Sequence, residues 1–444
     1  MRLSTSANGP ATRPSWHWAW PLALLTHSAL AQNMPPHALT PPAKTGQSSP
    51  ITTPALDQEQ IIAVVLEHNP QLRAAISARD AARSGIQSAT ALPNPRFDWN
   101  QGRNTARIPG VTPGTLQSWT FSQPIENPYA RQSRIDYANA SELESKHLIG
   151  QTRNALVSQV RLFIYQGLLH QAQATAAADD VQLLEQVRER VRIRVESGEA
   201  ARYEIIKADA EIITARERLQ TARLMVDQSK IQLNQLAAGQ LPAHWRLQGD
   251  LKDSQDLLDM AQLRHLMHQH NPELSLLQAD VTKAQAQLRS AESSRWPGVE
   301  LRYSQSRDPE FRQGQWGIGV QLPLLDRRSG PIAQASAELE RAQIRLEGRK
   351  AELEQQVLLT WKSLEMARLR IEALSQGSVR EAEAALRVAQ AAYRFGERGI
   401  LDVLDAQRVL RSVRADLIQA RYQLQEARVM LDQLVGQHIE HTPS

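Results

Sequence analysis

The sequence predicts a mainly α-helical protein with a small β part, built from two similar halves. Three observations predict this fold class: the composition, two very long helical stretches, and a repeat with a period near 200 residues. The 444 residues contain 5% aromatic residues and no cysteine, while Ala, Leu, Gln, Glu and Arg are abundant. Such a composition is typical of long helices.

Composition also excludes several classes of function. The lack of cysteine excludes a disulfide framework, a thiolate metal site, a cysteine nucleophile and a lipid-anchored N-terminal cysteine. The 51 basic and 47 acidic residues are interspersed and leave a formal charge of +4. No dense Lys/Arg stripe with interleaved aromatic residues is present, so nucleic-acid binding is not expected.

The N-terminal region has the layout of a secretory signal peptide. Arg2 and Arg13 precede a short apolar stretch at 18–25, and Ala31 ends an Ala-Leu-Ala sequence. We therefore expect a signal peptide over 1–31, with a disordered N-terminus as the alternative. Residues 32–56 are rich in Pro, Thr, Ser and Gln and predict a disordered leader. The rest of the chain has no apolar run long enough for a transmembrane helix.

An internal repeat divides the remaining chain. The tetrapeptide that begins at Asn69 returns at Asn271, and the segment 203–208 returns at 401–406. These and two further matches occur in the same order, which predicts a first structural repeat over 57–250 and a second over 251–444. The period is too long for a solenoid unit and indicates duplication of a whole module.

Each half contains signals for three helices. A short helix is expected at each Asn-Pro pair, because asparagine caps free amides and proline suits the first helical turn. Long helices are predicted over 129–196 and 331–395, and final helices run to about 238 and 436. Each long helix would span about 100 Å, so the helices must pack side by side as a coiled-coil bundle. Two shorter helices stacked end to end would match one long helix.

Between the short and long helices, each half has two segments in which apolar and polar residues alternate. The segments are each about ten residues long, which suits a tilted transmembrane strand. Trp99, Trp119, Trp296 and Trp316 lie in or beside them, as membrane-interface aromatic residues would. Pro124 and Pro323 mark the predicted junction between strands and long helices. The alternative is a pair of hairpins that cap a helical rod, with the tryptophans in a water-soluble core.

Four strands are too few to close a barrel, since about eight are needed. A membrane-spanning sheet must therefore be shared between copies of the chain. Two copies would give eight strands and a filled interior, whereas three copies would give twelve strands and an open lumen.

The sequence resembles the TolC outer-membrane efflux family over 57–436, and its second half is most similar to the CzcC-type, heavy-metal branch. The stretches that carry the resemblance are 92–95, 121–125, 322–331 and 393–407. It implies a homotrimer with a 12-stranded transmembrane β-barrel in outer-membrane lipid and a TolC-like α-barrel in the periplasm. Many relatives carry a lipidated cysteine, which this chain lacks.

The same resemblance implies a function. The function is that of a passive exit duct in a tripartite efflux system. The substrates are expected to be metal cations, which would make the protein part of a metal-resistance system. The implied partners are a periplasmic adaptor (a membrane fusion protein) and an inner-membrane proton-driven pump. Ducts for ATP-driven polypeptide secretion or for multidrug efflux, and a periplasmic coiled-coil scaffold without a pore, remain alternatives.

By motif position, the resemblance assigns a periplasmic gate and an acidic entrance ring to the helix turns. The gate residues are Tyr203, Glu204, Tyr393 and Arg398, and the ring residues are Asp402 and Asp405. A Glu204–Arg398 bond, or a bond centred on Tyr393, is the hypothesis for how the closed state is held.

The two aspartates are three residues apart and share a helix face, so three copies would gather six carboxylates and attract cations. The alternative for the carboxylates is stabilisation by the helix dipole, and the alternative for Arg398 is a solvated turn residue.

No enzyme motif is present: the sequence contains no Gly-rich phosphate loop, G-x-S-x-G or H-E-x-x-H. We therefore expect no catalytic residues and no cofactor, and the energy for transport must come from a partner. His265 and His268 are candidate metal ligands at a feasible spacing, and Met34 and His37 lie in the leader. No carboxylate completes a ligand set, so no metal site is expected.

Overall fold

The computed structural model describes residues 54–105, 109–110, 112–252, 259–322 and 324–436. The predicted signal peptide (1–31), most of the predicted leader and Pro323 lie outside the described residues. The leader prediction differs from the structure at its end, because Ala55–Leu56 forms strand β1. This strand pairs in parallel with β4 (Arg246–Leu247), so two residues assigned to the leader belong to the fold.

The described chain is mainly helical with a few strands, which confirms the predicted fold class. The other elements, in chain order, are α1 (Gln58–His68), α2 (Pro70–Thr90), β2 (Arg96–Asn104), β3 (Gly114–Ile125), α3 (Pro128–Glu196), α4 (Arg202–Leu236), α5 (Met260–His270), α6 (Pro272–Ser293), β5 (Gly298–Arg307), β6 (Arg312–Gln321), α7 (Ser329–Ala373), the π-helical turn η1 (Leu374–Ser378), α8 (Val379–Arg394) and α9 (Ile400–Val435). The order from α1 to α4 recurs from α5 to α9. The predicted repeat boundaries at 57–250 and 251–444 stay predictions.

Two features of the helices differ from the sequence prediction. A separate short helix, α1 or α5, precedes each Asn-Pro pair, where only one opening helix was predicted. The second long helix is also not uniform, since the π-helical turn η1 separates α7 from α8. At η1 the helical pattern of the sequence continues on both sides of the turn, so the sequence does not mark the change.

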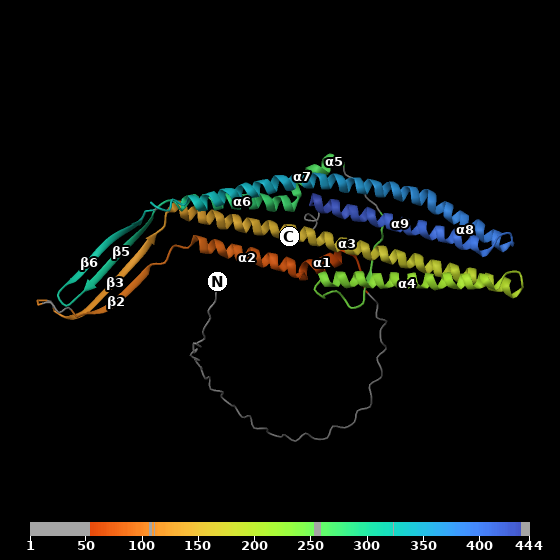
Figure 1. Ribbon diagram of the computed structural model, residues 1–444, viewed down its shortest axis with the longest axis horizontal. Coiled ribbons are helices and arrows are strands. Elements are labelled where there is room, and N and C mark those ends of the chain that lie inside the picture. Colours follow the sequence, from red (N-terminus) through yellow and green to blue (C-terminus); the bar gives the residue numbers. More distant parts are fainter. Residues whose placement is uncertain (1–53, 106–108, 111, 253–258, 323, 437–444) are drawn as a thin grey trace, which may run out of the picture. The chain divides into compact units, whose positions relative to one another are not determined.

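The two Asn-Pro pairs join helices as well as starting them. The Asn69 side chain accepts hydrogen bonds from the backbone N–H groups of Gln71 (2.9 Å) and Leu72 (3.3 Å). Its Nδ2 donates to the carbonyl of Leu236, the last residue of α4, at 2.9 Å. Asn271 makes the equivalent bonds at the start of α6 and donates to the carbonyl of Leu434 in α9 at 2.8 Å. This geometry confirms that pairs of short helices are stacked end to end along a long helix (Figure 1).

Replacing Asn271 with alanine should lower the free energy of unfolding by about 2 kcal/mol, because the cap and a buried link to α9 are both lost. Asn271→Asp retains the capping acceptor and should recover about half of that loss. Asn127→Ala is the matched control, since within the described residues the Asn127 side chain caps α3 and bonds to no other helix. Thermal unfolding followed by circular dichroism in detergent measures the difference. Equal losses for Asn271→Ala and Asn127→Ala would contradict a joining role.

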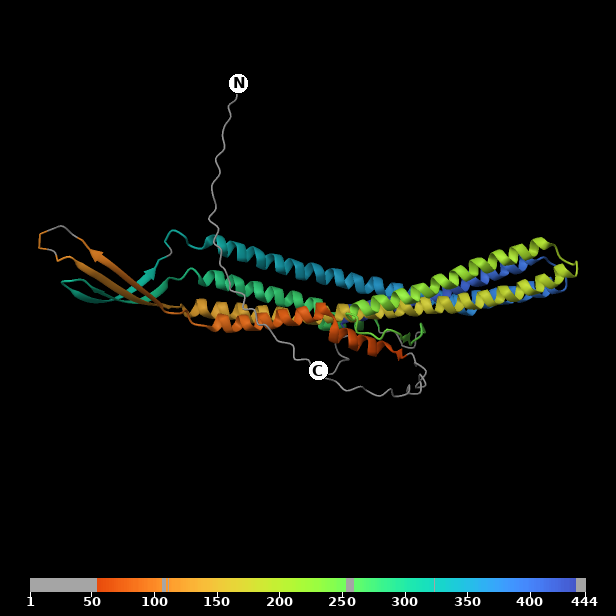
Figure 2. The same cartoon turned by 90° about the horizontal axis from the view of Figure 1, so that it is seen from below.

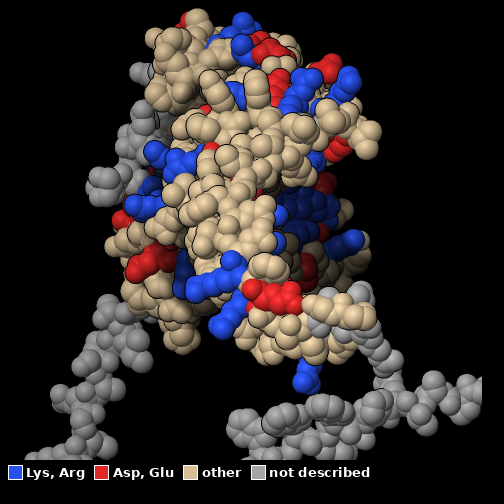
Figure 3. All heavy atoms as spheres, turned by 90° about the vertical axis from the view of Figure 1, so that its left-hand side faces the viewer, with Lys and Arg blue, Asp and Glu red and all other residues tan. Residues whose placement is uncertain are grey.

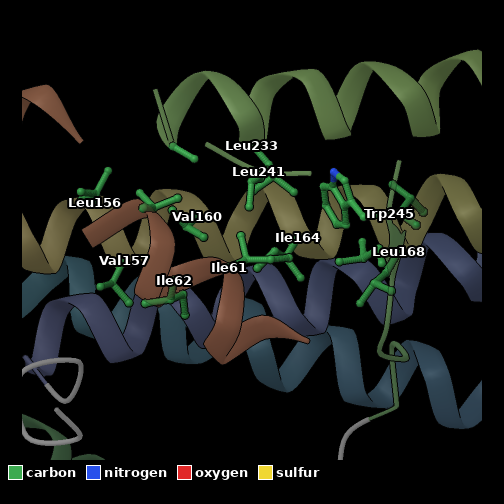
Figure 4. Packing of buried hydrophobic residues seen from close by; sticks show 14 of the residues in the cluster. Ile61, Ile62, Leu156, Val157, Val160, Ile164, Leu168, Leu233, Leu241 and Trp245 are labelled. Carbon is green, nitrogen blue, oxygen red and sulfur yellow. The ribbon is translucent and has the colours of Figure 1, made fainter. Parts of the chain in front are cut away.

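The largest described core lies where α1 packs against the middle of α3. Ile61 and Ile62 of α1 meet Val160 and Ile164 of α3, and Trp245 of the segment after α4 covers the cluster (Figure 4). Packing of this kind stabilises a very long helix more than helix propensity does.

The long helices form a layer with two free margins. Helix α3 packs against α4 and α9, and α9 packs against α7 and α8 (Figures 1 and 2). The main partner of α4 is α3. Helix α4 therefore lies at one margin of the layer and α7 at the other, while α8 reaches α4 only near the turns.

The four longer strands form an antiparallel sheet in the order β2-β3-β5-β6. Its register places Phe97, Phe121, Tyr303 and Trp316 in one row across all four strands. Residues two positions along each strand share their face, so one face is largely apolar and the other polar, as the alternation predicted. Strands β2 and β6 have no strand partner on their outer sides within the described residues.

The tryptophans are not distributed one per strand. Trp99, Trp119 and Trp316 lie in strands, but Trp296 precedes β5 at the helical end of the sheet. Tyr303 supplies the aromatic ring on β5, with ring centroids 5.2 Å from Trp119 and 4.6 Å from Trp316. The aromatic band therefore includes a tyrosine that the sequence prediction missed.

The junction between sheet and helices is held by polar contacts. Pro124 is the penultimate residue of β3, and the side chain of Gln123 donates to the Pro93 carbonyl at 3.0 Å. Arg134 of α3 donates to the carbonyls of Ala89 and Ala91 and forms an ion pair with Glu126. These contacts tie the end of α2 to the start of α3.

Charges of both signs are interspersed over the strand end of the molecule (Figure 3). In the part of the chain that the structure describes, no helix combines the length and apolar character needed to cross a membrane.

Candidate functional site

The two turns between long helices lie together at the end of the helical layer farthest from the sheet (Figure 1). Helix α3 ends at Glu196 and is followed by Gly198, with φ of 80°. Helix α8 ends at Arg394 and is followed by Gly396, with φ of 76°. Glycine adopts this left-handed conformation without the steric cost of a side chain. The sequence predicted both breaks correctly for this reason.

An arginine from one turn binds the other turn. Arg194, in the last turn of α3, donates from Nη1 to the backbone carbonyl of Tyr393 at 2.8 Å. Its guanidinium carbon also lies 4.7 Å from the centroid of the Tyr393 ring. Arg194 thus joins α3 to α8 by a charged hydrogen bond and a cation–π contact. Arg194 was not predictable from the sequence, because its partner is 199 residues away.

Tyr393 continues this network to a third helix. Its side chain is 5% exposed, and its hydroxyl donates to Glu204 Oε2 of α4 at 3.0 Å. Burial is the main cause that raises the pKa of Tyr393 to about 12, and the hydrogen bond to the Glu204 carboxylate is the second. The hydroxyl therefore stays protonated and able to donate at neutral pH. Together, Arg194, Tyr393 and Glu204 link α3, α8 and α4.

The other two predicted gate residues lie outside this network. Tyr203 is exposed and its ring lies beside Lys207, whose Nζ is 5.5 Å from the ring centroid. Arg398 forms an ion pair with Asp402 of its own helix at 3.7 Å. Within the described residues, the Glu204–Arg398 bond is not formed. Of the two bonds suggested by the sequence, the one present in the structure is centred on Tyr393, which donates to Glu204.

The predicted acidic residues have basic partners. Asp402 pairs with Arg398, and Asp405 Oδ1 lies 2.9 Å from Arg408 Nη1. Arg408 also bonds to Glu211 of α4, which raises the pKa of Arg408 above its ordinary value. Three carboxylates and two guanidiniums leave one net negative charge per chain in this group. Arg408 was recognisable from its spacing to Asp405, whereas Glu211 had no local signal.

Apolar side chains support the network from within the bundle. Val191 of α3, Ile212 of α4, Leu386 of α8 and Leu404 of α9 belong to one buried cluster that also includes Tyr393. Because these side chains are packed, the polar contacts at the turns are held at fixed positions.

The histidine candidates do not form a metal site. His268 Nε2 lies 3.1 Å from Glu354 Oε1 of α7, and His265 is exposed on α5. No group of three or more potential ligands suited to a metal ion occurs within the described ranges. Met34 and His37 lie outside the described residues.

Comparison with known proteins identifies relatives over nearly the whole chain. Residues 61–239 and 263–437 match the family described as outer membrane efflux protein. The cobalt-zinc-cadmium resistance protein CzcC of Cupriavidus metallidurans is 23% identical over 412 residues, covering 92% of this chain and 95% of CzcC.

Solved structures share the fold. CusC, described in the context of transmembrane channel formation, superposes with a TM-score of 0.74 at 17% identity, covering 88% of this chain and 95% of CusC. The open state of the outer membrane channel MtrE of Neisseria gonorrhoeae gives a TM-score of 0.72 at 18% identity, covering 85% of this chain and 88% of MtrE.

Proposed function

The chain belongs to the outer membrane efflux protein family, and from that premise we propose that it is the exit duct of a tripartite efflux system. Membership places the protein in the outer membrane as a passive channel and not an enzyme. In the proposal, three copies form a 12-stranded barrel in the outer membrane and a helical barrel in the periplasm. A periplasmic adaptor and an inner-membrane proton-driven pump deliver the substrates, which are metal cations.

The proposal rests on the fact that a single copy leaves its sheet edges unpaired and its apolar surfaces exposed in the described part of the chain. Within the described residues, the outer edges of the sheet at β2 and β6 have no strand partner. The apolar face of the sheet is exposed, with Trp316 71% accessible. The helical layer also ends in apolar margins. On α4 the exposed apolar residues include Ile206, Ile213, Leu224 and Ile231; on α7 they include Ile344, Leu359, Met366 and Leu369. Patches of this kind are rare on soluble monomers and indicate a protein or membrane contact.

Closure by three copies would pair each free margin with the opposite margin of the next copy. Twelve strands enclose a lumen, whereas eight strands leave an interior filled by side chains. In a trimer, both the sheet and the helical layer of each copy would continue into the next copy, and the twelve strands would leave an open lumen. Chemical cross-linking of the protein in native outer membranes tests this state, and a ladder that ends at dimers would overturn it.

Exposed apolar residues around the helix turns support docking of an adaptor. Ile193 and Tyr203 flank the first turn, and Phe395 and Leu401 flank the second, all with more than half of their surface accessible. Apolar residues exposed at a protein's end are suited to binding a partner.

Two observations support metal cations as substrates. CzcC carries cobalt, zinc and cadmium resistance in its name. The acidic group at the turns has one net negative charge per chain, which favours cations at a narrow entrance. Deleting the gene should sensitise the cells to zinc and cobalt and leave antibiotic susceptibility unchanged. Sensitivity to antibiotics alone would indicate a multidrug duct.

Neutralising the acidic group should weaken cation selectivity. We expect Asp402→Asn with Asp405→Asn to reduce the cation-to-anion permeability ratio about twofold. Arg398 loses its partner, Arg408 keeps only Glu211, and the local charge becomes positive. Reversal potentials across a salt gradient in planar bilayers measure the ratio. Asp416→Asn is the control, since Asp416 lies farther along α9 and pairs with Arg370. An unchanged ratio in the double variant would remove the entrance-ring role.

A further inference from the structure

A cavity with charged side chains in a mainly apolar wall lies in the helical layer and is not used by the proposed duct mechanism. It lies between α3, α4 and α9 and has a volume of about 480 Å³. Asp180, Arg218 and Arg411 each contribute a charged side chain to its lining from a different helix, and Glu217 and Arg414 also line it. The side chains of Ala176, Ala222 and Ile418 belong to its apolar wall.

The cavity contains hydrogen-bond donors without acceptors. The Nη1 atoms of Arg218 and Arg411 are both buried, and neither has a hydrogen-bond partner in the described part of the chain. The nearby Gln407 is 2% exposed and lies beside Asp180. Buried polar groups are nearly always satisfied in native proteins, so these donors indicate a missing acceptor.

The charges around the cavity favour an anionic acceptor. The Arg218 and Arg411 guanidiniums repel each other, and burial followed by this repulsion lowers the pKa of Arg411. Arg414 is already paired with Glu383, and Glu217 is exposed and accepts a hydrogen bond from Thr221. Asp180 attracts both guanidiniums, and burial raises the pKa of Asp180 despite them. Glu211, which is already paired with Arg408, attracts Arg411 as well. One carboxylate between two arginines leaves room for a further negative charge.

We propose that this cavity binds a small oxyanion that retains a proton, of which inorganic phosphate is the type. Arg218 and Arg411 donate to its oxygens, since guanidinium groups are suited to tetrahedral oxyanions. Asp180 accepts a hydrogen bond from the hydroxyl of the protonated anion. Sulfate has the same shape but no proton at neutral pH, so the Asp180 carboxylate would repel it. The site is therefore expected to distinguish phosphate from sulfate.

Isothermal titration calorimetry of the full-length protein in detergent, in a buffer without oxyanions, tests the proposal with sodium phosphate and sodium sulfate as probes. We expect one phosphate per chain, bound at least tenfold more tightly than sulfate. Arg218→Gln and Arg411→Gln should each weaken phosphate binding about tenfold or more, because each removes a charged hydrogen bond. Asp180→Asn should abolish the preference for phosphate. Arg216→Gln is the matched control, as Arg216 pairs with Glu185 and does not line the cavity.

Circular dichroism melting of each variant distinguishes lost binding from lost folding. If Arg411→Gln fails to fold, Arg411→Lys retains the charge without the planar fork and should still reduce affinity. The proposal is overturned if phosphate produces no binding heat with the wild-type protein. It is also overturned if the cavity variants bind phosphate as the control does, or if a trimer structure has a carboxylate of another copy in the cavity.

Discussion

Arg194→Glu is expected to raise the open fraction of the channel about tenfold, measured as single-channel conductance and open time in planar bilayers. In the structure Arg194 bonds to the Tyr393 carbonyl and contacts its ring, and Tyr393 bonds to Glu204. A charged hydrogen bond contributes about 1.5–3 kcal/mol, which corresponds to tenfold or more in an equilibrium. Glutamate at 194 would also face Glu199, the present ion partner of Arg194. The link between α3 and α8 would therefore become repulsive.

The matched control for this substitution is Arg192→Glu. Arg192 lies two residues earlier in α3, and its ion pairs are with Glu189 and Glu196 of the same helix. Its reversal changes the local charge equally, but the ion pairs that it breaks lie within α3. Arg398→Glu should also have a small effect, because Arg398 pairs within α9. Wild-type conductance and closed times in Arg194→Glu would show that this network does not hold the closed state.

The pKa of Tyr393 determines how the same network responds to pH. The folded-state value of about 12 exceeds the usual value of 10, so the stabilisation is fully present below pH 10. It is lost as the pH rises through about 12. Conductance should therefore not change through Tyr393 between pH 7 and pH 9. Tyr393→Phe, which removes only the bond to Glu204, should open the channel less than Arg194→Glu does.

The parts of the fold that depend on local chemistry were predictable from sequence. Asparagine followed by proline started α2 and α6, and Gly198 and Gly396 ended the long helices. Alternation of apolar and polar residues predicted the strands because its period is a property of the strand itself. The separate helix α1 was missed although Asp57 and Gln60 form a capping box at its start, which is a signal present in the sequence.

Site residues were predictable only where they lie in the motifs that carry the family resemblance. Tyr393 and Glu204 were identified from a family resemblance and are bonded in the structure. Arg194 and Glu211 were missed because their partners, Tyr393 and Arg408, lie in the other half of the chain. Long-range pairing depends on how the helices pack, and a single sequence does not determine which exposed arginine meets which carboxylate.

Ile213→Lys combined with Leu224→Lys is expected to abolish trimers and, with them, channel activity. Ile206, Ile213, Leu224 and Ile231 are separated by seven or eleven residues, close to whole numbers of helical turns. They therefore form one stripe on α4, and Ile213 and Leu224 are each 69% exposed. Burying such a side chain contributes about 1.5–3 kcal/mol, and the stripe occurs once at each contact between copies.

Two lysines in this stripe would have to bury their charges at every contact, so the closed ring should be disfavoured more than the single-copy fold. Size-exclusion chromatography in detergent should show monomers, bilayers should show no conductance, and the variant should not restore metal resistance to a deletion strain. Thr214→Lys is the control, because Thr214 is exposed a quarter-turn away from the stripe. The helical content should match that of the wild type, since α4 contacts α3 through the opposite face. Intact trimers in the double variant would mean that the α4 stripe does not form the contact between copies. A different surface of the helical layer would then have to join the copies into a closed duct.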